Sequence, residues 1–143
     1  MSSRPAGPSL VPLAAAADAA LVLVFVLIGR ASHGEGLWGV LLTWWPFLAG
    51  LAVGWLVARA WRHPLRLVWT GVIVWLVTVI VGMLLRVASG QGVQLSFVIV
   101  TVVVLGVFLL GWRAIALLVQ RRRSARIGRG ARATRRSRHP RIG

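Results

Sequence analysis

The sequence contains no cysteine, and its 143 residues include only two acids, Asp18 and Glu35. Without cysteine the chain forms neither a disulfide framework nor a thiolate metal site. No second His or acid lies at ligand spacing from His33, so a metal site is not expected there. A nucleophile paired with a base is also missing from the sequence. We therefore expect no catalytic residue, no metal, no cofactor and no enzymatic activity.

Apolar residues dominate the chain instead. Hydrophobic residues make up 58% of it, which is far too apolar for a soluble domain. Four apolar runs are each long enough to cross the roughly 30 Å hydrocarbon core of a bilayer as a helix. We predict an all-α fold, an integral membrane four-helix bundle that forms one membrane domain over residues 10–119. The spans are expected at about residues 10–29, 37–58, 67–85 and 95–119.

The segments on either side of the membrane domain are polar. Residues 1–9 contain two prolines and a glycine, which predicts a short flexible lead. Residues 120–143 repeat Arg at every third position from Arg123 to Arg141. Such a segment does not insert into hydrocarbon, so we expect a disordered cytoplasmic tail that is attracted to anionic lipid headgroups. Nucleic acid is the weaker alternative, because no aromatic residue is interleaved for base stacking.

Arginine also predicts the orientation, because all 17 cations are Arg and cations near span ends favour the cytoplasmic face. One side of the predicted bundle carries the tail and four further arginines, which are Arg4, Arg59, Arg62 and Arg66. The other side carries only Arg30 and Arg86. We predict a multi-pass protein of the cell (inner) membrane with both termini in the cytoplasm. The expected aromatic anchors at the inner boundary are Trp55, Trp61, Trp69 and Trp112.

Asp18 lies inside the first span, where a carboxylate costs roughly 2.5 to 3.5 kcal/mol on insertion scales. It therefore needs a cation in the protein interior. Arg113 is the candidate, because at about 1.5 Å per residue both side chains lie roughly 9 to 12 Å inside the same face. We predict a buried ion pair between Asp18 and Arg113. The pair either fixes helix register or takes part in a protonatable relay, and no second carboxylate or His at that depth supports the relay.

Two further arginines end the first and third spans on the outer side. Arg30 and Arg86 there complement the helix dipole and can extend to the interface, which is one interpretation. In the other, the two residues and His33 form an outward-facing site for a phosphate or carboxylate, and Glu35 neutralises part of it. The sequence leaves both interpretations open.

Repeats and small residues predict how the spans pack. The motif Arg-x-x-x-Gly-(Glu or Gln)-Gly at residues 30–36 recurs at residues 86–92. Either this match is chance, or the chain is two tandem helical hairpins related by a pseudo-two-fold axis along the membrane normal. Gly106 is expected to permit the close approach that Asp18 and Arg113 need. The positions expected at helix contacts are Pro46, Gly50, Gly54, Gly82 and Gly106.

Taken together, these motifs resemble a family of small bacterial membrane proteins known as domain of unknown function 3054. The residues that carry the resemblance are Asp18; Gly29-Arg30-x-x-His33; Trp45-Pro46-Phe47; Gly71, Trp75 and Thr78; Gly82-Met83-x-x-Arg86; Gly90-x-Gly92; Phe97; and Gly111-Trp112-Arg113. They lie between about residues 10 and 118, so the basic tail is outside the resemblance. Membership implies a four-span membrane protein with no established activity.

We therefore expect a small membrane component that assembles with itself or a membrane partner and binds or moves a small anionic solute on its outer side. The alternative is a purely structural or scaffolding protein with a lipid- or RNA-binding basic tail. A polar cavity that reaches Asp18 or Arg86 would favour the first, and spans packed shut around an Asp18–Arg113 pair would favour the second.

Overall fold

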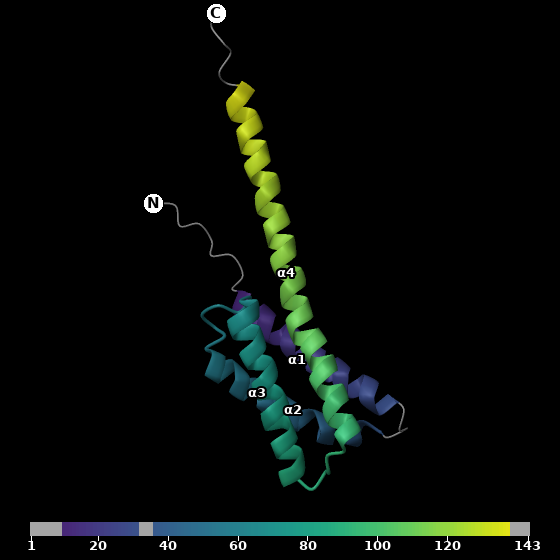
Figure 1. The fold of residues 1–143 in the computed structure, drawn as a ribbon. Coiled ribbons are helices and arrows are strands. Elements are labelled where there is room, and N and C mark those ends of the chain that lie inside the picture. The colour runs from purple at the N-terminus through teal and green to yellow at the C-terminus, as the bar shows by residue number, and fades with distance from the viewer. Residues whose placement is uncertain (1–9, 32–35, 138–143) are drawn as a thin grey trace, which may run out of the picture.

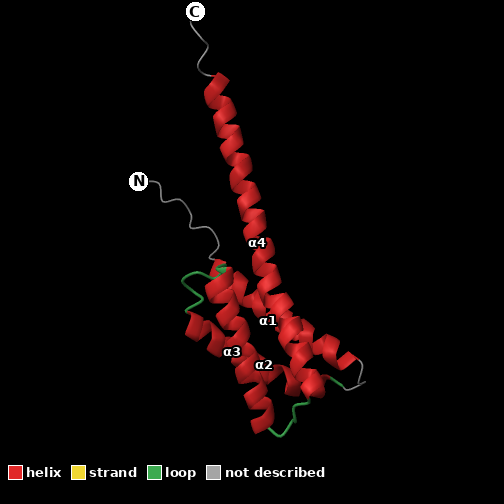
Figure 2. Ribbon diagram, viewed as in Figure 1, coloured by secondary structure: helices red, strands yellow, loops and turns green. Residues whose placement is uncertain are grey.

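A computed structural model describes residues 10–31 and 36–137, where four long helices and one short π-helical segment make up the fold (Figures 1 and 2). The elements are α1 (Leu10–Ala31), α2 (Leu37–Ala58), η1 (Leu67–Gly71), α3 (Val72–Ala88) and α4 (Leu95–Ser137). The all-α four-helix prediction is confirmed. The predicted lead, the link residues His33 and Glu35, and residues 138–143 lie outside the described residues.

The outward surface of the bundle is apolar. Large hydrophobic side chains are exposed on every long helix, for example Leu13, Leu56, Leu84 and Val107. A soluble bundle would bury such side chains, whereas bilayer hydrocarbon accommodates them. The segments that are long and apolar enough to span a membrane are Leu10–Arg30, Leu37–Ala58, Leu67–Ala88 and Leu95–Ala125. The chain is therefore a multi-pass membrane protein.

Successive helices run in opposite directions, which gives the bundle two ends (Figure 1). The start of α1, the α2–α3 link and Gln120 of α4 line one cavity, and we call this the tail end because α4 continues beyond it. Arg30 at the end of α1, Gly36 before α2 and Gln91 after α3 line another cavity, at what we call the far end.

Apolar side chains from all four long helices fill the space between the two ends. Phe25 of α1 and Phe47 of α2 pack edge to face with ring centroids 5.5 Å apart, and Phe97 of α4 is tilted against both rings. Further buried core residues are Val22, Val26, Leu51, Val74, Val79, Leu105 and Leu109. Protein atoms therefore close the middle of the bundle.

The most extensive contact of any helix pair joins α2 and α3. A Cβ added to Gly50 would lie only 2.8 Å from the backbone oxygen of Thr78, and one added to Gly54 would lie 3.0 Å from another α3 carbonyl oxygen. On α3, a Cβ at Gly82 would lie 2.5 Å from the ring of Phe47. Pro46 is buried on the same helix as the two α2 glycines. These small residues let the two backbones approach closely, as in other membrane helix pairs.

Gly106 differs from its expected role. A Cβ there would lie 3.2 Å from the indole of Trp75 on α3, and the Nε1–H of Trp75 donates to the Val102 carbonyl at 3.0 Å. Gly106 thus serves the α3–α4 contact, not the approach of α1 to α4. The long side chain of Arg113 spans the distance to Asp18, so no close backbone approach is needed there.

The pseudo-two-fold axis stays a prediction. Such an axis would exchange α1 with α3 and α2 with α4, so the α2–α3 contact would have the α1–α4 contact as its counterpart. Among the pairs of long helices that touch, α2 and α3 have the most extensive contact and α1 and α4 the least extensive.

The expected disorder of the tail is wrong for residues 120–137, because α4 continues as a helix to Ser137. The segment suited to the membrane ends near Ala125, and the helix projects beyond the bundle (Figure 1). A helix already formed inside the membrane needs no new nucleation to continue, and Arg and Ala rank among the best helix formers. Low hydropathy thus ends the span without ending the helix.

Candidate functional site

Asp18 of α1 and Arg113 of α4 form a two-point salt bridge near the tail end. Nη2 of Arg113 lies 2.7 Å from Oδ2 of Asp18, and Nη1 lies 2.8 Å from Oδ1. Both side chains have 0% exposure. The structure thus brings together the two residues that the sequence analysis paired by depth.

Two indole groups complete the hydrogen bonding of the Asp18 carboxylate. Nε1–H of Trp55 donates to Oδ2 and Nε1–H of Trp112 donates to Oδ1, each at 2.8 Å. The carboxylate therefore accepts two bonds from Arg113 and two from tryptophans, which matches its capacity of about four. The sequence analysis placed both tryptophans at the inner boundary as anchors and missed this role. The signal was available, since one Arg supplies only two of the donors that a buried carboxylate requires.

The Arg113 guanidinium has three further contacts. Its Nε donates to the Pro64 carbonyl at 3.1 Å, and its Nη1 also donates to the Leu109 carbonyl at 2.9 Å. Its Cζ lies 4.8 Å from the centre of a Trp112 ring. The side chain passes close to Gly71, where an added Cβ would lie 3.3 Å from Arg113 Cδ. The pair thus ties together α1, α2, the α2–α3 link and α4.

At the far end, Arg30 and Arg86 each donate to a neutral side chain. Nη1 of Arg30 donates to Oγ1 of Thr43 at 2.6 Å, and Nη1 of Arg86 donates to Oε1 of Gln91 at 2.9 Å. The Cζ of Arg86 lies 4.5 Å from the centre of the Phe97 ring. Nε of Arg86 is buried and has no hydrogen-bond partner within the described part of the chain.

The turn after α3 explains how Gln91 reaches Arg86. Gly90 and Gly92 have φ values of 72° and 69°, in the left-handed region that favours glycine. The residue between them is held by two bonds, because the Gln91 backbone N–H donates to the Arg86 carbonyl at 3.0 Å and its Nε2 donates to Oγ of Ser89 at 2.9 Å. The repeated Gly-x-Gly motif therefore positions a neutral side chain beside Arg86.

Arg30, Thr43 and Arg86 all line two adjoining cavities at the far end. The smaller has a volume of about 150 Å³ and is also lined by Phe25, Val26, Gly29 and Phe97. The larger, of about 500 Å³, is also lined by Gly36, Trp38, Gly39, Leu42 and Gln91. None of these described residues is acidic. The structure thus brings together two of the three predicted anion-site residues, and the third, His33, lies outside the described residues.

The fold and these two sites define a class of protein, a small four-span membrane bundle with one neutralised arginine and a pair of arginines beside cavities. Residues 15–116 match the family described as "Protein of unknown function (DUF3054)", and the chain belongs to this family. The resemblance inferred from the sequence motifs is therefore confirmed. The match includes residues of both sites and ends before the basic tail. No curated protein and no solved structure matches the chain.

Proposed function

We propose that this protein binds a small anion, carrying a phosphate or carboxylate group, at the far end of its bundle. The observation that carries the proposal is that Arg30 and Arg86 line the same two cavities, and that the buried Nε of Arg86 has no hydrogen-bond partner among the described residues. Two guanidinium groups beside one space repel each other, and an anion between them relieves that repulsion. Guanidinium groups also match the geometry of carboxylate and phosphate oxygens.

The size of the cavities supports a small ligand. The smaller cavity, of about 150 Å³, has room for roughly five water molecules at about 30 Å³ each. The unpartnered Nε of Arg86 is a donor for the ligand, while Phe97 covers one face of the guanidinium. The larger cavity beside Trp38 and Gln91 is the access route in this proposal.

The far end faces the outside of the cell in this proposal. It has Arg30 and Arg86, whereas the tail end has Arg59, Arg62 and Arg66 in one link and further arginines on α4. Cations near span ends favour the cytoplasm, so we assign the arginine-rich tail end and both termini to the cytoplasm. In the same proposal the bundle lies in the cell inner membrane. The anion therefore comes from the outer solution or the outer leaflet.

Binding, not passage, is the activity that we propose. Core side chains close the bundle between the far-end cavities and the ion pair. Asp18 and Arg113 are fully buried and bonded to each other. The second candidate is a scaffolding protein that assembles with itself or a membrane partner, and the same closed core favours it.

Thermal unfolding of the purified full chain in neutral detergent tests the proposal. Inorganic phosphate should raise the unfolding temperature more than chloride does at equal ionic strength, because a ligand that binds only the folded state stabilises it. Arg30→Gln and Arg86→Gln should each remove most of that difference. Arg122→Gln is the matched control, because it removes the same charge from an exposed position on α4.

Three results would contradict anion binding. The first is an equal response to phosphate and chloride in the wild type. The second is a phosphate response that the two far-end variants retain. The third is an equal loss in the Arg122→Gln control, which would trace the response to general positive charge.

A further inference from the structure

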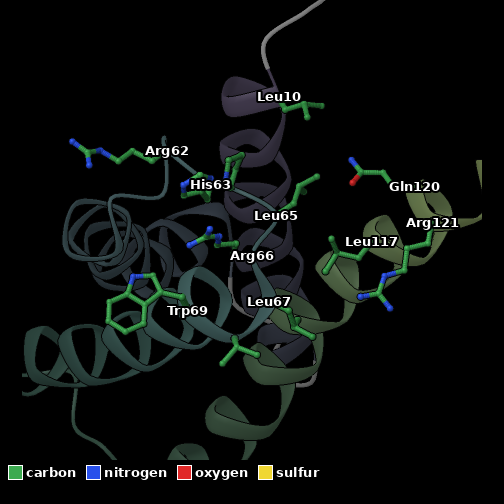
Figure 3. Close-up of a pocket in the computed structure, with 12 residues that line it drawn as sticks. Leu10, Arg62, His63, Leu65, Arg66, Leu67, Trp69, Leu117, Gln120 and Arg121 are labelled. Atoms are coloured by element: carbon green, nitrogen blue, oxygen red, sulfur yellow. The ribbon is translucent and has the colours of Figure 1, made fainter. Parts of the chain in front are cut away.

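The tail end carries the largest of the cavities described above, about 710 Å³, and the far-end proposal makes no use of it (Figure 3). It opens between α1, the α2–α3 link and α4. Figure 3 shows His63 and Arg66 of the link on one side and Gln120 and Arg121 of α4 on the other. Its apolar lining comes from Leu10, Leu65, Leu67, Val68, Trp69 and Leu117.

An apolar groove continues from this cavity along the contact between α1 and α4. The groove has a volume of about 390 Å³ and shares Leu10, Leu65 and Gln120 with the larger cavity. The rest of its lining comes from the two helices, namely Leu13, Ala14, Ala16 and Ala17 of α1 and Trp112 and Ala116 of α4. Small alanine side chains leave this space open, and the contact between the two helices is correspondingly limited.

No described residue that lines the larger cavity is an acid, so none offsets the charges around it. Arg62, Arg66 and Arg121 line it. Among the residues that the structure describes, Asp18 is the one acid, and Arg113 already neutralises it. The cavity therefore combines a positively charged rim with an apolar wall, at the level where the membrane-spanning part of α4 ends.

We propose that an anionic phospholipid from the leaflet at the tail end occupies both cavities. Its headgroup lies at the mouth of the larger cavity, in the positive field of Arg66 on one side and Arg121 on the other, and one acyl chain lies in the groove between α1 and α4. Basic pockets between membrane helices bind phospholipid headgroups in this way. The apolar groove distinguishes a lipid from a free anion, because a free anion would gain nothing from it.

The lipid also covers a residue of the ion-pair site. The groove reaches Trp112, whose indole donates to Asp18 and whose ring lies against Arg113. An acyl chain there covers Trp112, which is only partly buried within the protein. The lipid thus completes a helix contact that the protein side chains leave unfilled. This site is separate from the far-end anion site, so either proposal can fail without the other.

Native mass spectrometry of the full chain tests the lipid site. The protein is released from detergent after incubation with phosphatidylglycerol or with phosphatidylcholine of the same acyl chains. The wild type should retain one phosphatidylglycerol in preference to phosphatidylcholine. The double variant Arg66→Gln/Arg121→Gln should weaken retention about 25-fold, at about fivefold for each arginine near the membrane surface.

Two matched controls separate this site from the general charge of α4. Arg122→Gln/Arg123→Gln removes the same charge from exposed positions that do not line the cavity, and it should retain the lipid. Ala116→Leu fills the groove without changing charge and should also weaken retention. Ala52→Leu adds the same bulk at an exposed position on α2 and should not.

Each contrary outcome overturns the proposal. Equal release from the two double variants would mean that the diffuse charge of α4 holds the lipid. Equal retention of the two lipids would mean that the arginines do not select the headgroup. Unchanged retention in Ala116→Leu would place the lipid elsewhere. Displacement of the lipid by excess inorganic phosphate alone would assign the cavity to a free anion.

Discussion

Two arginines at opposite ends of this bundle both pack against an aromatic ring, but one bonds to an acid and the other to a neutral side chain. Arg113 and Arg86 both lie against an aromatic ring, at 4.8 Å from Trp112 and 4.5 Å from Phe97. Arg113 meets the carboxylate of Asp18, whereas Arg86 meets the neutral side-chain oxygen of Gln91. The Asp18 carboxylate neutralises Arg113, whereas the described residues place no acid beside Arg86.

The difference separates structural charge from charge that is available to a ligand. Taking two ions out of water costs several kcal/mol for each, and their attraction repays this only when the remaining donors and acceptors are also bonded. At the tail end, two indoles and two backbone carbonyls supply those bonds. At the far end, Thr43 and Gln91 supply neutral acceptors to Arg30 and Arg86, and the proposed anion would bind in the cavities beside them.

The largest expected difference between the two ends is in the activity of a reporter fused at each, because the ends are predicted to lie on opposite sides of the membrane. A reporter that is active only in the cytoplasm should be active when fused after Arg123 and silent when inserted in the 30–36 link. The positive-inside asymmetry of the link arginines is the reason. Activity at both positions would overturn the span count, and the reversed pattern would place the far end in the cytoplasm.

The next effect is the loss of stability when either partner of the closed site is removed. Asp18→Asn and Arg113→Gln should each lower the free energy of unfolding by about 3–5 kcal/mol, because each leaves an uncompensated buried charge. The double variant should recover part of the loss. Thermal unfolding in detergent and the amount of folded protein in the membrane measure both.

Arg86→Gln is the matched change at the open site. It should cost about 1.5–3 kcal/mol, as expected for one hydrogen bond between a charged and a neutral group, and less than at Arg113 because no buried acid is left without its partner. Strictly additive losses in the Asp18/Arg113 cycle would mean that the two side chains do not act together. A loss at Arg86 as large as that at Arg113 would remove the contrast between the two ends.

The sequence contained enough to predict the four spans and the pairing of Asp18 with Arg113. Apolar runs of sufficient length identify spans because a bilayer allows few other structures. A single acid inside a membrane span requires a cation at the same depth in the membrane, and the sequence contains few arginines within its spans. The same argument does not predict that Trp55 and Trp112 donate to Asp18, because a tryptophan near a span end is also expected as an interfacial anchor.

Other features depend on tertiary contacts that no local pattern encodes. The Pro64 carbonyl reaches Arg113 because the α2–α3 link folds back over α4. Gly106 lies on a face that the sequence could assign to either neighbour, and Trp75 of α3 takes it. The two cavities shared by Arg30 and Arg86 follow from the packing of all four long helices, so the sequence left the anion site as one of two interpretations.

The smallest effects compare tryptophans in the two halves of α2. Trp55 donates its indole N–H to Asp18, whereas Nε1 of Trp44 is buried with no hydrogen-bond partner in the part of the chain that the structure describes. Trp55→Phe should therefore cost about 1.5–3 kcal/mol, as expected for a hydrogen bond to a charged group. Trp44→Phe removes a donor that makes no bond, so its cost should be limited to the smaller ring.

Unfolding of the two variants under identical detergent conditions measures this difference, and Trp112→Phe should behave like Trp55→Phe because its indole also donates to Asp18. The chemistry of the change is the same at all three positions, so ring volume cancels to first order and the bond to the carboxylate remains. Equal losses at Trp44 and Trp55 would mean that packing volume, not the donated bond, sets the stability of the closed site. The contrast should also shrink in an Asp18→Asn background, because the acceptor is then uncharged and a hydrogen bond between neutral groups contributes only about 0.5–1.5 kcal/mol.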